Sequence, residues 1–135
     1  PCLVASTSSH VSVTFLGTAS QAPSVSRNVS SLALRWPSGS IWLFDCGEGT
    51  QHQLLKTSLK LSHVDFIFIT HLHGDHVFGL PGLLCTLGQQ RTVTEDGDAG
   101  DPVHIVGPPG TAAFVHGTLK LSFSHLCFKV IIHGT

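Results

Sequence analysis

The stretch that decides the fold is Val64-Asp65-Phe66-Ile67-Phe68-Ile69-Thr70-His71-Leu72-His73-Gly74-Asp75-His76, an apolar run that ends in three imidazoles and a carboxylate. Its first seven residues predict a strand, because β-branched and aromatic side chains favour a pleated, buried surface. Side chains two positions apart in an extended segment point the same way, so His71 and His73 can bind one cation together. The strand therefore ends in a predicted metal site.

The residues after His73 turn the chain and begin a helix. Gly74 lets the backbone turn sharply without a side chain in the way. Asp75 and His76 then fall at the N-terminus of the helix, which directs them away from the first pair and toward a second cation. Mixed imidazole and carboxylate ligands suit zinc, with manganese or iron as substitutes. The alternative is a histidine-rich surface loop or a cluster of core histidines without a metal.

The composition predicts a soluble protein with one core. The chain has 135 residues, of which 41% are hydrophobic and 11% are charged, so it forms one domain or part of one. Its longest apolar run, residues 77–87, is interrupted by Pro81, so we expect no membrane span. The residues from Pro1 onward show no basic-then-apolar leader, so we expect no secretory signal, but the sequence does not begin with Met and targeting stays undecided. We expect an intracellular, cytoplasmic protein, with a nuclear or organellar location left open.

Overall charge and cysteine usage give no sign of a nucleic-acid partner or of a cysteine-based site, although a local basic patch could still bind nucleic acid. The formal net charge is −1, so the overall balance does not point to nucleic-acid binding. The four cysteines form no Cys-x-x-Cys pair, which argues against a zinc ribbon or a disulfide framework. Histidine, with ten copies, is the abundant metal-ligating residue type.

Strands and helices alternate along the chain. Apolar periodicity predicts strands at residues 11–16, 31–35, 41–44, 64–70, 103–106 and 126–132, and helices at 51–59, 82–90 and 111–121. Thr50 is a natural N-cap for the first helix. Alternation of this kind, with continuous apolar strands, indicates an α/β architecture in which helices cover a sheet. We treat 1–135 as one domain with an acidic loop at 92–102, which lacks the ligands of an EF-hand.

Loops that follow Leu16, Phe44 and Ile69 are expected at one edge of the sheet if their strands share a direction. Asp45 would there accept a hydrogen bond from a ligating histidine and fix its tautomer and ring orientation. A turn or helix-capping aspartate is the alternative reading of that residue. In the turn 47–50, backbone N–H groups at the start of a helix would suit an anion.

Five segments of the chain form a recognisable combination. They are Phe15-Leu16-Gly17-Thr18, Arg27-Asn28, Leu43-Phe44-Asp45-Cys46-Gly47-Glu48-Gly49-Thr50, Ile69-Thr70-His71-Leu72-His73-Gly74-Asp75-His76 and Phe78-Gly79-Leu80-Pro81-Gly82-Leu83. Together they resemble the tRNase Z family of the metallo-β-lactamase superfamily, and its short form in particular. The His-x-His-x-Asp-His motif alone marks only the superfamily, and the other segments narrow the resemblance to this family.

The resemblance implies a metallo-β-lactamase-like αββα sandwich, of which this chain would form the N-terminal half, a mixed sheet with flanking helices. It implies two zinc ions, with His71 and His73 as ligands of one and Asp75 and His76 as ligands of the other. Asp75 would also be the proton acceptor. The implied reaction removes the 3′ trailer from precursor tRNA by attack of metal-bound hydroxide on a phosphodiester, in a homodimer. Arg27, Asn28, Gly49 and Thr50 are candidates for substrate binding.

The chain ends before the segments from which the family takes its remaining metal ligands. The later histidines do not fall at matching positions; they are His104, His116, His125 and His133. We therefore expect the chain to be inactive alone. Two other readings stay open, which are a different superfamily hydrolase acting on a small phosphodiester, sulfate ester or thioester, and a truncated, non-catalytic product.

Overall fold

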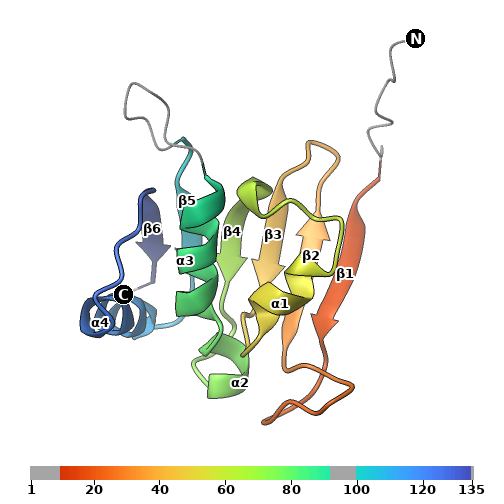
Figure 1. The fold of residues 1–135 in the computed structure, drawn as a ribbon, viewed down its shortest axis with the longest axis horizontal. Coiled ribbons are helices and arrows are strands. Elements are labelled where there is room, and N and C mark those ends of the chain that lie inside the picture. Colours follow the sequence, from red (N-terminus) through yellow and green to blue (C-terminus); the bar gives the residue numbers. More distant parts are fainter. Residues whose placement is uncertain (1–9, 92–99, 135) are drawn as a thin grey trace.

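A mixed six-stranded sheet is the frame of the computed structural model, which describes residues 10–91 and 100–134 (Figure 1). In spatial and chain order its strands are β1 (Ser12–Gly17), β2 (Ser31–Arg35), β3 (Ile41–Phe44), β4 (Val64–Phe68), β5 (Val103–Val106) and β6 (Val130–His133). The pairs β1–β2 and β2–β3 are antiparallel, and the pairs from β3 to β6 are parallel. Within this sheet β2 therefore opposes the other strands, and β1, β3 and β4 share one direction.

Helices cover one face of the sheet. They are α1 (Thr50–Leu55), the one-turn helices η1 (Leu61–His63) and α2 (Gly74–Val77), α3 (Leu80–Gln90) and α4 (Thr111–Leu121). Figure 1 shows α1 and α3 in front of the central strands, with α2 below α3 where the metal-ligand motif lies. Alternate residues of the strands point toward these helices and are fully buried, among them Leu43, Ile67 and Ile105. They meet Leu83 and Leu87 of α3 in one core cluster.

The opposite face of the sheet is aromatic and partly open. Trp42 is the register partner of Phe66, and Phe44 is that of Phe68, with ring centroids 5.1 Å and 4.9 Å apart respectively. Directly opposite residues share a face of the sheet, so this row continues to Phe15, which is 69% exposed. No helix of the described residues covers it. An apolar face of this size is typical of a surface that packs against another layer.

The predicted strands at 31–35, 41–44 and 103–106 and the predicted helix at 111–121 are confirmed with their bounds. The first helix was predicted to reach residue 59, and this is wrong. The Thr57 hydroxyl donates to the Leu54 carbonyl and accepts from the Leu59 N–H, a local turn that competes with helix continuation. The helix therefore ends after Leu55.

Several other boundaries differ from the sequence prediction. The strand predicted at 11–16 is Ser12–Gly17, the strand predicted at 64–70 ends at Phe68, and the helix predicted at 82–90 begins at Leu80. Thr50 is not the N-cap of α1, because Gly49, with φ 73°, takes that position and the Thr50 hydroxyl turns inward to the Gly47 carbonyl at 2.7 Å. The last strand begins at Val130 rather than at residue 126. Cys127 instead donates its thiol to the Gly88 carbonyl of α3, and Phe128 is buried in the core.

Most of the predicted acidic loop at 92–102 lies outside the described residues, which omit 92–99. Arg91, which directly precedes this loop, donates from Nη2 to the Val64 carbonyl at 2.6 Å and so anchors the end of α3 to the start of β4. In the part of the chain that the structure describes, no helix is long and apolar enough to cross a membrane.

Candidate metal centre

The loops that follow β1, β3 and β4 meet at one edge of the sheet, which confirms the predicted convergence. Figure 1 shows this edge at the bottom, beside α2. Backbone hydrogen bonds join the loop after β3 to α2, because the Cys46 N–H donates to the His76 carbonyl and the Gly79 N–H donates to the Cys46 carbonyl. Gly79 is required by this contact, since a Cβ there would lie 2.1 Å from the Gly47 carbonyl oxygen.

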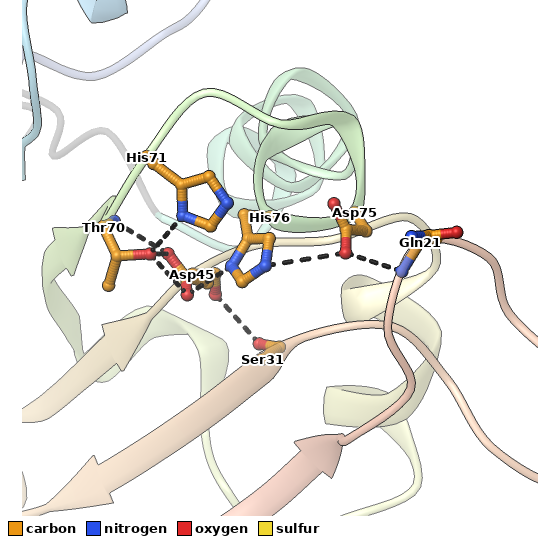
Figure 2. Close-up of polar contacts among 7 residues, drawn as sticks. All are labelled: Gln21, Ser31, Asp45, Thr70, His71, Asp75 and His76. Atoms are coloured by element: carbon orange, nitrogen blue, oxygen red, sulfur yellow. Dashed lines mark hydrogen bonds and ion pairs between the residues drawn. The ribbon is translucent and has the colours of Figure 1, made fainter.

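Asp45 is the buried centre of this edge. It is 6% exposed and adopts a left-handed backbone, with φ 60°. Its Oδ1 accepts hydrogen bonds from the Thr70 N–H at 2.8 Å and the Thr70 hydroxyl at 2.9 Å, and its Oδ2 lies 2.7 Å from His76 Nδ1 (Figure 2). Aspartate tolerates the left-handed region better than most residues because its short side chain bonds locally.

The contact with Asp45 decides which ring nitrogen of His76 is free. A carboxylate can only accept, so His76 Nδ1 carries the proton and donates it to Asp45. The lone pair of the neutral ring is then on Nε2. That atom lies 3.6 Å from Asp75 Oδ2. Asp45 thus has the geometry of a residue that orients a metal-ligating histidine.

Asp75 lies in the first turn of α2, directed toward the loop after β1. The backbone N–H of Gln21 donates to Asp75 Oδ2 at 2.7 Å, as Figure 2 shows. This hydrogen bond lowers the pKa of Asp75 below its ordinary value; burial opposes the shift, and the nearby His76 and His73 reinforce it. The carboxyl is therefore ionised near neutral pH, the form that a metal ligand or a proton acceptor requires.

His71 and His73 adjoin the other two candidate ligands. The centroids of their rings are 4.6 Å apart, and the His71 ring is 4.0 Å from that of His76. The Thr70 hydroxyl lies 3.1 Å from His71 Nδ1, so Thr70 contacts both Asp45 and the first histidine of the motif. The structure therefore brings His71, His73, Asp75 and His76 together at one edge.

The imidazole and carboxylate atoms of His76 and Asp75 have a spacing that fits two ligands of one zinc ion. Two ligand atoms of a tetrahedral zinc ion are about 3.4 Å apart, given metal–ligand distances of about 2.0–2.1 Å. The separation of 3.6 Å between His76 Nε2 and Asp75 Oδ2 is close to that value. Within residues 10–91 and 100–134, no group of three or more His, Cys, Asp or Glu is arranged to hold one ion.

Cys46, although next to Asp45, is not suited to bind a metal here. The thiol is buried, and this desolvation raises the pKa of Cys46 to about 12, against a small opposing effect of a hydrogen bond with Thr50. A thiol with so high a pKa stays protonated near neutral pH, whereas metals bind the thiolate.

The predicted substrate-binding residues lie in the loop after β1 and at the start of α1, and they differ in accessibility. Arg27 and Asn28 line a recess of about 320 Å³ that also includes Lys56, and we name it the basic recess. Asn28 packs close to Gly49, since its Oδ1 would be 3.3 Å from a Cβ placed there. Thr50 is fully buried with its hydroxyl bonded to Gly47, so it offers no side-chain atom to a ligand in this structure.

A second recess, of about 480 Å³, lies against the motif itself. His73 and Asp75 line it together with Phe78 and Glu48, and we name it the phenylalanine recess.

Two of the later histidines contact each other away from the motif, since His104 Nδ1 and His133 Nε2 are 2.8 Å apart.

The sequence did not indicate three contacts of the site. Gln21 acts through its backbone N–H, which no side-chain pattern reveals. Thr70 precedes the motif directly, and its position at the end of an apolar strand was the available signal. Ser31 donates its hydroxyl to the Asp45 carbonyl at 3.0 Å and holds the loop from the neighbouring strand β2 (Figure 2).

Comparison with known families and structures agrees with the resemblance predicted from the sequence. The family model described as Anti-Pycsar protein Apyc1 matches residues 11–94. A Ribonuclease Z from Prochlorococcus marinus (strain MIT 9301) is 51% identical over 121 residues, which is 89% of this chain and 36% of that protein. The chain thus spans about a third of the length of the curated relatives it matches.

Two solved structures extend the comparison to the fold. Human tRNase Z, short form (ELAC1), matches with a TM-score of 0.80 at 49% identity, over 90% of this chain and 43% of the human one. The metallo-beta-lactamase fold protein YhfI from Bacillus subtilis matches with a TM-score of 0.68 at 17% identity, over 93% of this chain and 46% of its own. The second likeness concerns the fold alone. The predicted resemblance to tRNase Z and the metallo-β-lactamase-like fold are confirmed.

Proposed function

Because the chain belongs to the family described as Anti-Pycsar protein Apyc1, with the metallo-β-lactamase fold and close similarity to Ribonuclease Z, we propose that it is part of a zinc-dependent endoribonuclease. The proposed reaction removes the 3′ trailer from precursor tRNA. The single observation that carries the proposal is the alignment of His76 by buried Asp45, with Nε2 of His76 turned toward the Asp75 carboxylate. Since precursor tRNA is made inside cells, we also propose an intracellular protein.

In this proposal His71 and His73 hold one zinc ion, and Asp75 and His76 hold the other. The chain spans 36% of the Prochlorococcus relative, so we propose that the remaining ligands come from sequence beyond these 135 residues. When bound, the two ions would lower the pKa of a water molecule and neutralise charge on the phosphoryl oxygens. We further propose the homodimeric state implied by the resemblance.

The residues of this chain have distinct tasks in that reaction. Asp45 holds the His76 ring and its tautomer, and the Gln21 N–H keeps the Asp75 carboxylate ionised and directed into the site. Asp75 then accepts the proton of the attacking water. Arg27 and Asn28, with Gly49 beside them, bind the RNA backbone near the cut, because phosphate contacts fix the register of a nucleic acid.

The test compares two substrates in the protein whose coding sequence contains these residues. A precursor tRNA with a 3′ trailer should be cut once, at the trailer, and a small chromogenic phosphodiester should be a poor substrate. A hydrolase for small phosphodiesters would show the reverse preference, and that result would overturn the assignment.

Two substitutions separate metal binding from turnover. His73→Ala should lower the zinc content and abolish cleavage. Asp75→Ala should keep part of the zinc and still lose cleavage by about 100-fold or more, since a positioned proton acceptor contributes about 10²–10⁴-fold. Lys120→Ala, on the exposed surface of α4, is the control and should leave both unchanged. Full activity in either site variant is incompatible with the proposed roles.

A further inference from the structure

The phenylalanine recess holds a feature that the metal ligands do not explain. Phe78 follows α2 directly and is 64% exposed, although it is a large apolar side chain next to a polar site. A large exposed ring beside a polar recess offers a flat apolar surface against which another planar group can pack. One edge of the ring is fixed against α2, because a Cβ at Gly74 would lie 2.2 Å from Phe78 Cε2 and 2.6 Å from both Cδ2 and Cζ. The ring is therefore held in place with much of its surface available.

The recess beside this ring has the size and lining of a small-molecule site. Its volume of about 480 Å³ is within the range of about 300–1,000 Å³ that is typical of ligand pockets. Pro23 and Val29 add apolar surface to it. His73 and Asp75 form part of the same wall, so a group bound against Phe78 lies next to the candidate metal ligands.

The charges of the two recesses differ in sign. Glu48 and Asp75 line the phenylalanine recess, and among the described residues that line it there is no lysine or arginine. In the proposed function Asp75 holds a metal ion, so the scissile phosphate would lie at the metal and an uncharged planar group could lie against Phe78. The basic recess, with Arg27 and Lys56, has the complementary character. The basic recess thus suits a phosphate group, and the apolar part of the phenylalanine recess suits a base.

We propose that Phe78 is a stacking platform for a nucleobase that flanks the scissile phosphate of the precursor RNA. This rests on the proposed function and adds a positioning residue to it. Stacking on an aromatic side chain tolerates every base, because each has a π-face, so the contact fixes the position of the strand without selecting its sequence. The cleaved segment must be single-stranded at this nucleotide, since a base in a helix cannot present its face.

The experiment uses 2-aminopurine, a fluorescent base that is quenched when it stacks. It is placed at either of the two nucleotides flanking the cleavage position of a precursor tRNA, and binding is followed in EDTA, so that the signal does not depend on metal or turnover. The protein is the product of the coding sequence that contains this chain. We expect quenching at one of the two positions, loss of quenching in Phe78→Ala, and its return in Phe78→Tyr. Leu55→Ala, an equally apolar and exposed residue on α1, should quench like the wild type.

Cleavage kinetics give a second, independent measurement. Loss of one base–aromatic stack should raise KM about 5- to 150-fold in Phe78→Ala, with kcat changed by about threefold or less. A substrate that is abasic at the quenched position should raise the wild-type KM equally, and it should raise the KM of Phe78→Ala no further. If Phe78→Ala fails to fold, Phe78→Leu, which keeps an apolar side chain without a ring, takes its place in both measurements.

Three results would overturn the stacking role. They are the absence of quenching at both positions in the wild type, quenching that persists in a folded Phe78→Ala protein, and a wild-type KM that does not respond to the abasic substrate. Persisting quenching would show that the base stacks on a group other than Phe78, and an unchanged KM would show that the base contributes nothing to binding. Failure of the proposed function is distinguishable, because the wild type would then not cut the trailer from an unmodified precursor tRNA.

Discussion

Replacement of Asp45 by asparagine should weaken zinc binding without unfolding the protein. Asparagine tolerates the left-handed backbone at this position, where φ is 60°, nearly as well as aspartate. With its oxygen in place of Oδ1, it still accepts the hydrogen bond that the Thr70 N–H makes at 2.8 Å. Its NH₂ group then faces His76 Nδ1. Two donors cannot share that contact, so the His76 proton moves to Nε2 and blocks the proposed metal ligand.

The size of the effect follows from the contact that is lost. Substituting a residue that orients a metal-bound histidine lowers metal affinity about 10- to 100-fold, or about 1.4–2.7 kcal/mol. The reverse orientation of the amide would restore the contact with His76 but place the asparagine NH₂ against the Thr70 N–H, and a buried unpaired donor costs about 1–3 kcal/mol. The two penalties are of similar size, so neither orientation avoids a loss.

Zinc affinity is measured by competition with a chromophoric chelator near neutral pH, and folding is followed by circular dichroism. Ser31→Ala is the matched control, because it removes a 3.0 Å hydrogen bond to the backbone carbonyl of Asp45 and leaves the carboxylate untouched. It should lower stability by about 1 kcal/mol and keep wild-type zinc affinity. The reasoning fails if folded Asp45→Asn binds zinc within about twofold of the wild type, a change too small for a blocked ligand.

Other predictions concern the fold around the site. Gly79→Ala should destabilise the protein by about 3 kcal/mol in denaturant unfolding, because its Cβ would lie 2.1 Å from the Gly47 carbonyl oxygen. Gly117→Ala, with nothing within 4 Å of its Cβ inside α4, should instead stabilise by about 0.5–1 kcal/mol, and equal effects of the two would contradict the packing argument. The Cys46 pKa of about 12 lies above the value of 9.0 for an exposed thiol, so the unfolded chain ionises first. Stability should therefore be unaffected below about pH 9 and fall by about 1.4 kcal/mol per pH unit above it until about pH 12, and Cys46→Ala should remove this slope. The same slope in both proteins would show that Cys46 is not responsible.

The strands of the sheet and the position of the metal-ligand motif could be predicted from the sequence for one physical reason. Strands such as 41–44 and 64–68 are short, apolar on both faces and bounded by turns, so periodicity and composition agree on them. The polar residues that follow such strands are forced to the same edge once the strands are parallel. Asp45 and the motif at 71–76 were therefore predicted as neighbours without knowledge of any distance.

Contacts made by the backbone of loops distant in the sequence could not be predicted. The hydrogen bond from Gln21 to Asp75 spans 54 residues and depends on a left-handed backbone at Gln21, with φ 65°, where no glycine signals it. The early end of α1 depends on the Thr57 hydroxyl, which forms a turn that propensity alone does not distinguish from a helix. The exposure of Phe78 likewise depends on where the loop after β1 meets α2, and no pattern in the sequence predicts that position.

Asp45 links the stability of the sheet to the orientation of His76. Its backbone N–H donates to the Phe68 carbonyl at 2.7 Å, which continues the β3–β4 pairing by one residue, and its carboxylate accepts from Thr70 and His76. Asp45→Ala should therefore lose both functions, with about 3 kcal/mol lost from unpaired Thr70 groups and left-handed strain. Asp45→Asn loses mainly the second. Because the sheet edge sets the position of the carboxylate before any metal binds, the His76 tautomer is fixed by folding itself. A metal at this edge would therefore meet a His76 ring that already presents its Nε2 lone pair.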